Sequence, residues 1–175
     1  MARYPNAIWK GANDEDYSRT HITPRFIVIH VEQGSETGTD AWFHDPQSQV
    51  SAHFGVSKLG VVSQFVDTAY EAYAECAYNG VGISIEHEGY SGEHLTYQQI
   101  DADARLLMWI NETHGVPLRW QVNALHRGGV VGHGELAVLG GDHLDCPGIP
   151  IKDDVRNLLN KLRRPSFRIT FTKGH

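Results

Sequence analysis

The chain has 175 residues, of which 41% are apolar and 21% are charged, and its formal net charge is −6. This length and composition predict one globular domain whose core needs no disulfide framework. The acidic balance and the lack of a basic run argue against a nucleic-acid partner, and no segment approaches the roughly 18 apolar residues of a membrane span. We expect a monomer that binds neither nucleic acid nor a membrane.

The polar residues 1–24 contain Asn, Asp and Pro and predict an irregular lead-in with a short helix. They lack the apolar stretch of a secretory signal, so we expect the protein to be cytoplasmic in the cell that makes it. The apolar, β-branched run from Arg25 to Val31 predicts a buried strand. We place the folded domain at residues 25–163 and a C-terminal tail, with strand-like alternation over 167–172, at residues 164–175.

The segments after this strand predict a loop, a short helix and a β-hairpin. The loop covers 34–38, the helix runs from a cap at Thr39 or Asp40 through Phe43 and ends near Pro46, and the hairpin strands cover 50–57 and 61–66. Lys58-Leu59-Gly60 between the hairpin strands places a glycine in the turn. Alternating apolar residues predict a further strand from Val81 to Glu88.

The second half of the chain predicts two helices and a short strand. Apolar residues recur at helical spacing from Thr96 to His114, with Thr96 as N-cap and Gly115 as the stop. Residues 130–131 predict the strand, and Asp153 to Leu162 an amphipathic helix. Because strands and helices alternate along the chain, we expect an α/β fold: a single domain in which a central mixed β-sheet is flanked by helices.

Three residues are candidate metal ligands. His30 follows the first buried strand, His133 lies between two glycines, and Cys146 lies in an Asp-Cys-Pro-Gly sequence. Zinc binds imidazole nitrogen and thiolate sulfur, and a catalytic zinc site has three protein ligands and an open position. Each residue alone is more simply explained as structural, and a disulfide between Cys76 and Cys146 would remove the thiolate. The three together predict a zinc hydrolase.

Other polar residues could complete such a site. Glu86 alternates with the apolar residues of its strand, so its side chain is expected on the opposite face. Glu86 is either a solvent-exposed residue on the polar face of the strand or a general base that takes a proton from water. His53 could contact the substrate or hydrogen-bond a neighbour, and His143 lies close enough in sequence to Cys146 to replace one of the three ligands.

In this order, these residues resemble those of the type 2 N-acetylmuramoyl-L-alanine amidases, a family that includes phage endolysins, bacterial recycling amidases and animal peptidoglycan recognition proteins. The resemblance extends from about Arg25 to Val155. It is carried by the strand that ends in His30, by Val50-Ser51-Ala52-His53-Phe54 with Gly60, by Gly82-Ile83-Ser84-Ile85-Glu86, by Gly132-His133 and by Asp145-Cys146-Pro147-Gly148.

The resemblance implies a zinc ion in a groove on one side of the sheet and peptidoglycan as the substrate. His30, His133 and Cys146 would be the ligands. Glu86 would be the catalytic glutamate in hydrolysis of the amide between N-acetylmuramic acid and L-alanine of the stem peptide. The residues expected to contact the substrate are His53, Tyr73 and Asn79, and His143 is expected to take part in catalysis.

Three positions depart from the family pattern. Leu144 stands where many members carry a lysine, and His143 and His126 are candidates to replace that cation. Ala52 stands where some members have tyrosine. Ala72-Tyr73-Ala74 stands where relatives often have Trp-His, and Tyr73 could keep a stacking surface for sugar or peptide.

Other functions stay open from the sequence. A recognition module would hold a muropeptide without cutting it, although such relatives typically lose the thiol ligand. A cysteine hydrolase would use Cys146 as the nucleophile and a histidine as the base, and chelator sensitivity separates it from a zinc enzyme. A purely structural zinc site is a third alternative.

The biological role has two candidates within the family. The first is a phage or prophage endolysin that reaches the cell wall after holin-type release, and the second is a cytoplasmic muropeptide-recycling amidase. Recycling members usually carry Asp as the third ligand, so Cys146 favours the endolysin.

Overall fold

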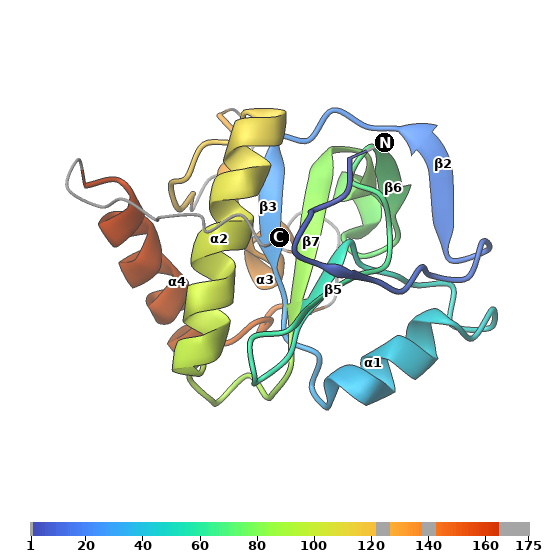
Figure 1. The fold of residues 1–175 in the computed structure, drawn as a ribbon, viewed down its shortest axis with the longest axis horizontal. Coiled ribbons are helices and arrows are strands. Elements are labelled where there is room, and N and C mark those ends of the chain that lie inside the picture. The colour runs from blue at the N-terminus through green and yellow to red at the C-terminus, as the bar shows by residue number, and fades with distance from the viewer. Residues whose placement is uncertain (1, 122–126, 138–142, 165–175) are drawn as a thin grey trace.

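The computed structural model describes residues 2–121, 127–137 and 143–164 (Figure 1). Its elements in chain order are β1 (Ile8–Trp9), β2 (Tyr17–His21), β3 (Phe26–Ile29), α1 (Glu36–Phe43), β4 (Phe54–Val56), β5 (Val62–Gln64), β6 (Tyr70–Ala72), the 3₁₀ helix η1 (Cys76–Val81), β7 (Gly82–His87), α2 (Tyr97–His114), β8 (Gly129–Gly132), α3 (His133–Ala137) and α4 (Ile149–Leu162).

The central sheet has six strands in the order β1-β5-β4-β7-β3-β8. The hairpin strands β4 and β5 pair antiparallel, and the other neighbours pair parallel. A separate two-stranded sheet joins β2 to β6 in antiparallel orientation. The structure therefore confirms the predicted single α/β domain with a mixed sheet.

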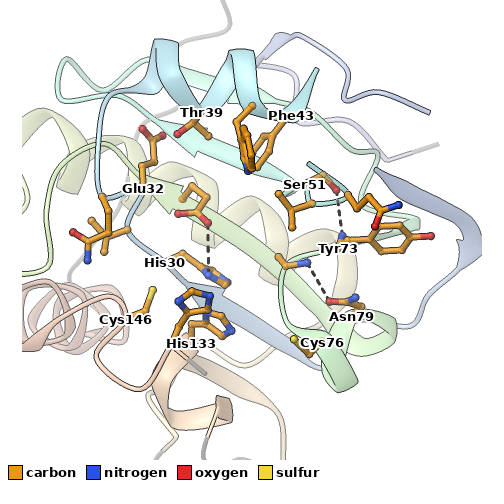
Figure 2. Close-up of a pocket in the computed structure, with 18 of the residues that line it drawn as sticks. His30, Glu32, Thr39, Phe43, Ser51, Tyr73, Cys76, Asn79, His133 and Cys146 are labelled. Carbon is orange, nitrogen blue, oxygen red and sulfur yellow. Dashed lines mark hydrogen bonds and ion pairs between the residues drawn. The ribbon is translucent and has the colours of Figure 1, made fainter. Parts of the chain in front are cut away.

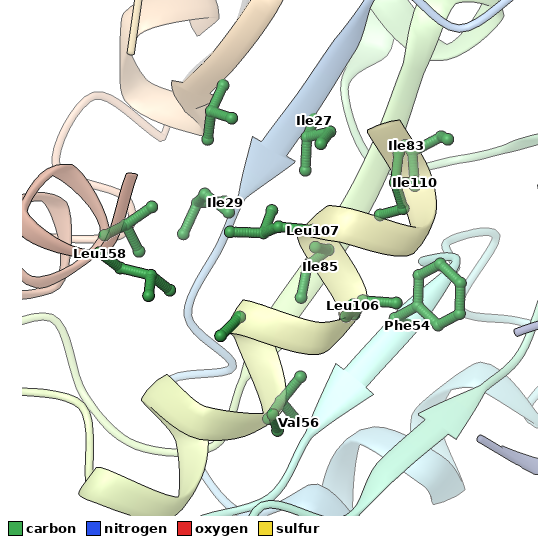
Figure 3. Packing of buried hydrophobic residues seen from close by; sticks show 14 of the residues in the cluster. Ile27, Ile29, Phe54, Val56, Ile83, Ile85, Leu106, Leu107, Ile110 and Leu158 are labelled. Carbon is green, nitrogen blue, oxygen red and sulfur yellow. The ribbon is translucent and has the colours of Figure 1, made fainter. Parts of the chain in front are cut away.

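The main core lies between the sheet and the helices α2 and α4 (Figures 1 and 3). In β3, Ile27 and Ile29 belong to this core, whereas Phe26 and Val28 belong to a second cluster with Val131 and Leu136. This alternation follows from the two-residue period of a strand, which sends successive side chains to opposite faces. A side chain two residues after Val28 therefore continues on the face opposite α2.

Local signals at both ends of α2 are confirmed. The Thr96 side chain accepts a hydrogen bond from the Gln99 N–H, and the Gln99 side chain accepts one from the Thr96 N–H. At the other end, Gly115 has a φ of 72°, the left-handed conformation that favours glycine after a helix. These caps explain why the boundaries of this helix can be predicted from its sequence alone.

The N-terminal segment differs from the prediction. In place of a short helix it forms two strands, β1 and β2, whose partners are β5 and β6. The predicted helix is wrong because both strands are short and largely exposed, so they depend on hydrogen bonds to distant strands and show no apolar pattern of their own.

Two helices begin earlier than predicted, and two, η1 and α3, were not predicted. Helix α1 begins at Glu36, with the Ser35 side chain accepting a hydrogen bond from the Gly38 N–H, rather than at Thr39 or Asp40. Helix α4 begins at Ile149, and α3 occupies a segment expected to be a loop. The predicted tail strand and His126 lie outside the described residues. Among the helices that the structure describes, none has the length and apolar character needed to cross a bilayer.

His53 is fully buried beside the sheet and bonds protein atoms through both ring nitrogens. Its Nδ1 accepts from the backbone N–H of Ser84 at 3.1 Å, so its Nε2 carries the proton and donates to the carbonyl of Tyr70 at 3.0 Å. Burial lowers the pKa of His53 from its ordinary 6.5 to about 4. The neutral ring therefore joins β7 to β6.

This arrangement predicts a loss of stability in acid. Between about pH 6.5 and pH 4, unfolded His53 binds a proton that the folded protein excludes, so the free energy of unfolding falls as pH falls. The slope from this one residue is about 1.4 kcal/mol per pH unit at its steepest. Urea unfolding at several pH values should show a shallower acid slope for His53→Asn than for the unmodified protein, and equal slopes would contradict this assignment.

Candidate metal and catalytic site

The register of three parallel strands brings His30, Glu86 and His133 to one level of the sheet. Ile29 of β3 pairs with Ile85 of β7 on one side and with Gly132 of β8 on the other. The residue that follows each of these is one of the three polar residues: Glu86 within β7, His30 directly after β3, and His133 at the start of α3. Because side chains alternate along a strand, Glu86 points to the face opposite the main core, and the contacts of His30 with Glu86 and with the His133 ring place both histidines on that face.

Cys146 reaches the two histidines from the loop before α4 (Figure 2). The rings of His30 and His133 lie 4.4 Å apart between centroids, and one donor atom each from His30, His133 and Cys146 all lie within 4.8 Å of one another. The Gly134 N–H donates to the carbonyl of Cys146 at 2.8 Å and so ties this loop to α3. The three residues predicted as metal ligands are therefore placed together.

Gly134 permits this close approach. A Cβ at this position would collide with the carbonyl oxygen of Leu144 and would lie 2.9 Å from the carbonyl oxygen of Cys146. Any larger residue must push the Cys146 loop away from His133. The close packing of the Cys146 loop therefore explains why position 134 is a glycine, and only the folded structure shows this packing.

The three residues lie at one end of a cavity of about 950 Å³. Figure 2 shows α1 with Thr39 and Phe43 on one side, and Tyr73 and Asn79 further along. The lining combines aromatic side chains with carboxylates, imidazoles and amides from distant segments. A cavity of this size accommodates a small ligand or the reacting part of a larger one.

Glu86 borders both the cavity and His30. Its Oε1 lies 3.7 Å from His30 Nδ1, and 17% of its side chain is exposed. Burial raises the pKa of Glu86 from 4.5 to about 7. A carboxylate with a pKa near neutrality can both accept and return a proton, which is the property of a general base.

Other groups of the site are also held neutral by burial. Burial raises the pKa of Glu32 to about 8, with the charge of Glu86 adding to the effect. Burial likewise holds the pKa of His30 well below its ordinary value, and His133 contributes further. A neutral imidazole is the form that binds a metal.

Cys146, unlike the histidines, must be charged to bind a metal, because the thiolate is the ligand form. Burial, and then the nearby charge of Glu86, raise its pKa to about 12, so the metal-free site favours the thiol over the thiolate. A bound cation would reverse this preference, since a coordinating thiol is deprotonated by the metal. The donor set therefore fits a divalent metal ion better than it fits a free nucleophile.

The remaining predicted residues have different positions. Tyr73, Asn79 and His143 line the cavity, and the ring of His143 lies 5.4 Å from that of His133. The Asn79 side-chain oxygen accepts from the N–H groups of Ala74 and Glu75, which fixes the loop before η1. His53 does not line the cavity, and its ring nitrogens bond Ser84 and Tyr70, so we assign it to supporting the strands rather than to contacting substrate.

Two carboxylates at this site were not predicted from the sequence. Glu32 lines the cavity two residues after His30. Glu75 is buried behind the cavity, and its Oε1 lies 3.6 Å from His30 Nε2. Glu32 could have been inferred from its position after the strand end, whereas the sequence around Glu75 shows no pattern that places it beside His30.

Comparison with known proteins identifies the amidase family that the sequence resembles. The sequence profile of the N-acetylmuramoyl-L-alanine amidases matches residues 20–149. N-acetylmuramoyl-L-alanine amidase A of Achromobacter lyticus is 31% identical over 116 residues, an alignment that spans 65% of this chain and 66% of that protein. The chain therefore spans just under two thirds of the length of this relative.

Solved structures with this fold include two proteins of low sequence identity to this chain. N-acetylmuramoyl-L-alanine amidase LysC from Clostridium intestinale is 15% identical, with a TM-score of 0.63 over 90% of this chain and 99% of that one. The hydrolase AmiA of Staphylococcus aureus, solved with its ligand, is 16% identical, with a TM-score of 0.68 over 93% and 84%. At these identities the likeness shows a shared fold. With the match of the family profile over most of its length, the chain belongs to the N-acetylmuramoyl-L-alanine amidase family.

Proposed function

We propose that this protein is a zinc-dependent hydrolase that cleaves the amide between N-acetylmuramic acid and L-alanine of the peptidoglycan stem peptide. The observation that carries the proposal is the convergence of His30, His133 and Cys146 within 4.8 Å, beside Glu86 and at the end of an open cavity. Three protein ligands next to a cavity suit a catalytic site, because a structural zinc is usually enclosed by four ligands.

Zinc is the metal that best suits this donor set. Two imidazole nitrogens and one thiolate match its preference for nitrogen and sulfur ligands, whereas magnesium and calcium prefer oxygen. A zinc ion held by these residues supplies Lewis-acid polarisation of the amide carbonyl and makes water more acidic.

The protein supplies the proton transfers. Glu86 accepts a proton from the attacking water at its carboxylate and returns it to the departing amine of L-alanine. Burial raises the pKa of this carboxylate, which makes it a stronger base toward the proton of water. His143, at the cavity rim, replaces the lysine found in many members by donating a hydrogen bond to the oxygen that gains charge.

The rest of the cavity receives the substrate. Tyr73 offers an aromatic surface to sugar or peptide, and Asn79 holds the loop that carries Tyr73 and Glu75. The peptidoglycan strand is far larger than the cavity, so only the reacting amide and its neighbours need enter. We propose that the protein acts on this substrate as a monomer.

The two rival functions are less well supported. A recognition module has no need of Cys146 or of a carboxylate with a pKa near 7 beside the ligands. A cysteine hydrolase needs a thiolate, whereas burial holds the thiol of Cys146 in its protonated form.

We further propose the role of a phage or prophage endolysin, which stays in the producing cell until a holin-type lesion gives it access to the wall. The support is Cys146 as third ligand, since recycling members of the family usually carry Asp there. The alternative, a muropeptide-recycling amidase, would act on soluble fragments in preference to intact wall.

Digestion of purified peptidoglycan tests the reaction. Mass spectrometry should detect free stem peptides that begin with L-alanine, and a chelator should abolish them until zinc is added back. Glu86→Gln should lower the rate at least about 100-fold while zinc content is retained, because general-base catalysis typically contributes that much. Glu88→Gln, two residues along the same segment, is the matched control and should keep the rate.

The outcomes separate the three functions. Cleavage that ignores the chelator would assign Cys146 as a nucleophile, and binding without cleavage would assign a recognition module. Full activity of Glu86→Gln would remove Glu86 from the mechanism.

A glycine substitution tests the ligand geometry. Gly134→Ala should weaken zinc binding strongly, because the added methyl group displaces the loop that carries Cys146. Gly92→Ala, where an added Cβ meets no atom within 4 Å, should leave zinc binding unchanged. Zinc affinity can be measured by competition with a chromophoric chelator, and equal affinities for the two variants would contradict the assigned role of Gly134.

A further inference from the structure

Glu75 is a buried carboxylate that the proposed reaction does not use. Its side chain is fully buried, and Glu75 is not among the residues that line the cavity. It precedes η1, but its side chain makes no capping hydrogen bond to that helix. Burial raises the pKa of Glu75 well above its ordinary value, and the nearby Ser84 hydroxyl opposes this effect. An ionisable group kept in such a place has an energetic cost that needs an explanation.

The His30 ring lies between two carboxylates. Glu86 Oε1 is 3.7 Å from Nδ1, and Glu75 Oε1 is 3.6 Å from Nε2. Within the described part of the chain, His30 Nε2 and both carboxylate oxygens of Glu75 are buried atoms without a hydrogen bond of normal geometry. The ring thus presents Nδ1 beside the cavity-lining Glu86, and Nε2 toward the interior.

We propose that Glu75 is a positioning residue, which accepts a hydrogen bond from Nε2–H of His30 and so directs Nδ1 to the metal. The inference rests on the proposed metal site. A metal-binding histidine generally donates its other N–H to a carboxylate, a carbonyl or water, which fixes the tautomer and the orientation of the ring. A shift of a few tenths of an ångström would bring the 3.6 Å separation to hydrogen-bond distance.

Gly82 leaves the space that the Glu75 carboxylate occupies. A Cβ on Gly82 would lie 3.0 Å from Glu75 Cδ and 3.1 Å and 3.2 Å from its two oxygens. The backbone at Gly82 is extended, with φ −103° and ψ 147°, so its conformation does not require glycine. The missing side chain therefore leaves room for Glu75 against the start of β7.

A purely structural role makes a different prediction. If Glu75 only filled space, Glu75→Gln would change neither metal affinity nor the ring of His30, because glutamine has nearly the same shape. If the carboxylate orients His30, the substitution should weaken zinc binding about 10-fold to 100-fold, because a neutral amide oxygen is a weaker acceptor for Nε2–H and the amide NH₂ group can turn toward the ring in its place.

The experiment compares zinc affinity with metal-free stability in the whole chain. Zinc affinity is measured by competition with a chromophoric chelator, and stability by urea unfolding in the presence of a strong chelator. Glu75→Gln should lose affinity while its metal-free unfolding midpoint does not fall. Glu71→Gln is the matched control, because it removes a carboxylate close enough to Glu75 to raise its pKa, yet it lies in β6 and does not line the cavity.

A second variant keeps the carboxylate and moves it. Gly82→Ala should displace Glu75 and lower zinc affinity in the same direction, and it decides the question if Glu75→Gln does not fold. Unchanged zinc affinity in a folded Glu75→Gln protein, or in Gly82→Ala when that variant decides, overturns the inference while the proposed function stands. If the unmodified protein binds no zinc, the proposed function itself fails and this inference falls with it.

Discussion

The site depends on the parallel pairing of β3 with β7 and β8. This pairing fixes a register in which His30, directly after β3, is flanked by Glu86 on β7 and by His133, which directly follows β8. A slip of one residue in either pair would send a functional side chain into the core beneath α2, because neighbouring residues of a strand face opposite ways. The main core therefore sets the geometry of the site as well as the stability of the fold.

Burial gives the site its chemistry. Burial shifts the ionisable residues around His30 toward their neutral forms: it raises the pKa values of Glu86, Glu32 and Cys146 and lowers that of His30. In a site of this kind a divalent ion is the strongest local charge, and it favours the ionised forms of nearby acids. Metal binding and ionisation of the thiol are thus expected to be linked, with protons released as the metal binds.

The sequence predicted the features that local patterns determine. The buried strand before His30, the hairpin turn at Gly60 and both caps of α2 follow from nearby residues. The strands β1, β2 and β6 were not predicted, since their partners lie far away in sequence. Residue types and the family resemblance indicated His30, His133, Cys146 and Glu86. The position of Glu75 behind His30 and the burial of His53 depend on contacts between distant segments, so they required the folded structure.

The central claim is that His30, His133 and Cys146 together hold a zinc ion beside Glu86. X-ray absorption at the zinc edge of the zinc-loaded protein tests it most directly, because it reports the ligand atoms themselves. The account predicts one sulfur at about 2.3 Å and two imidazole nitrogens at about 2.0 Å, with the sulfur lost in Cys146→Ser. A zinc shell without sulfur in the unmodified protein, or a protein that retains no zinc, would contradict the account.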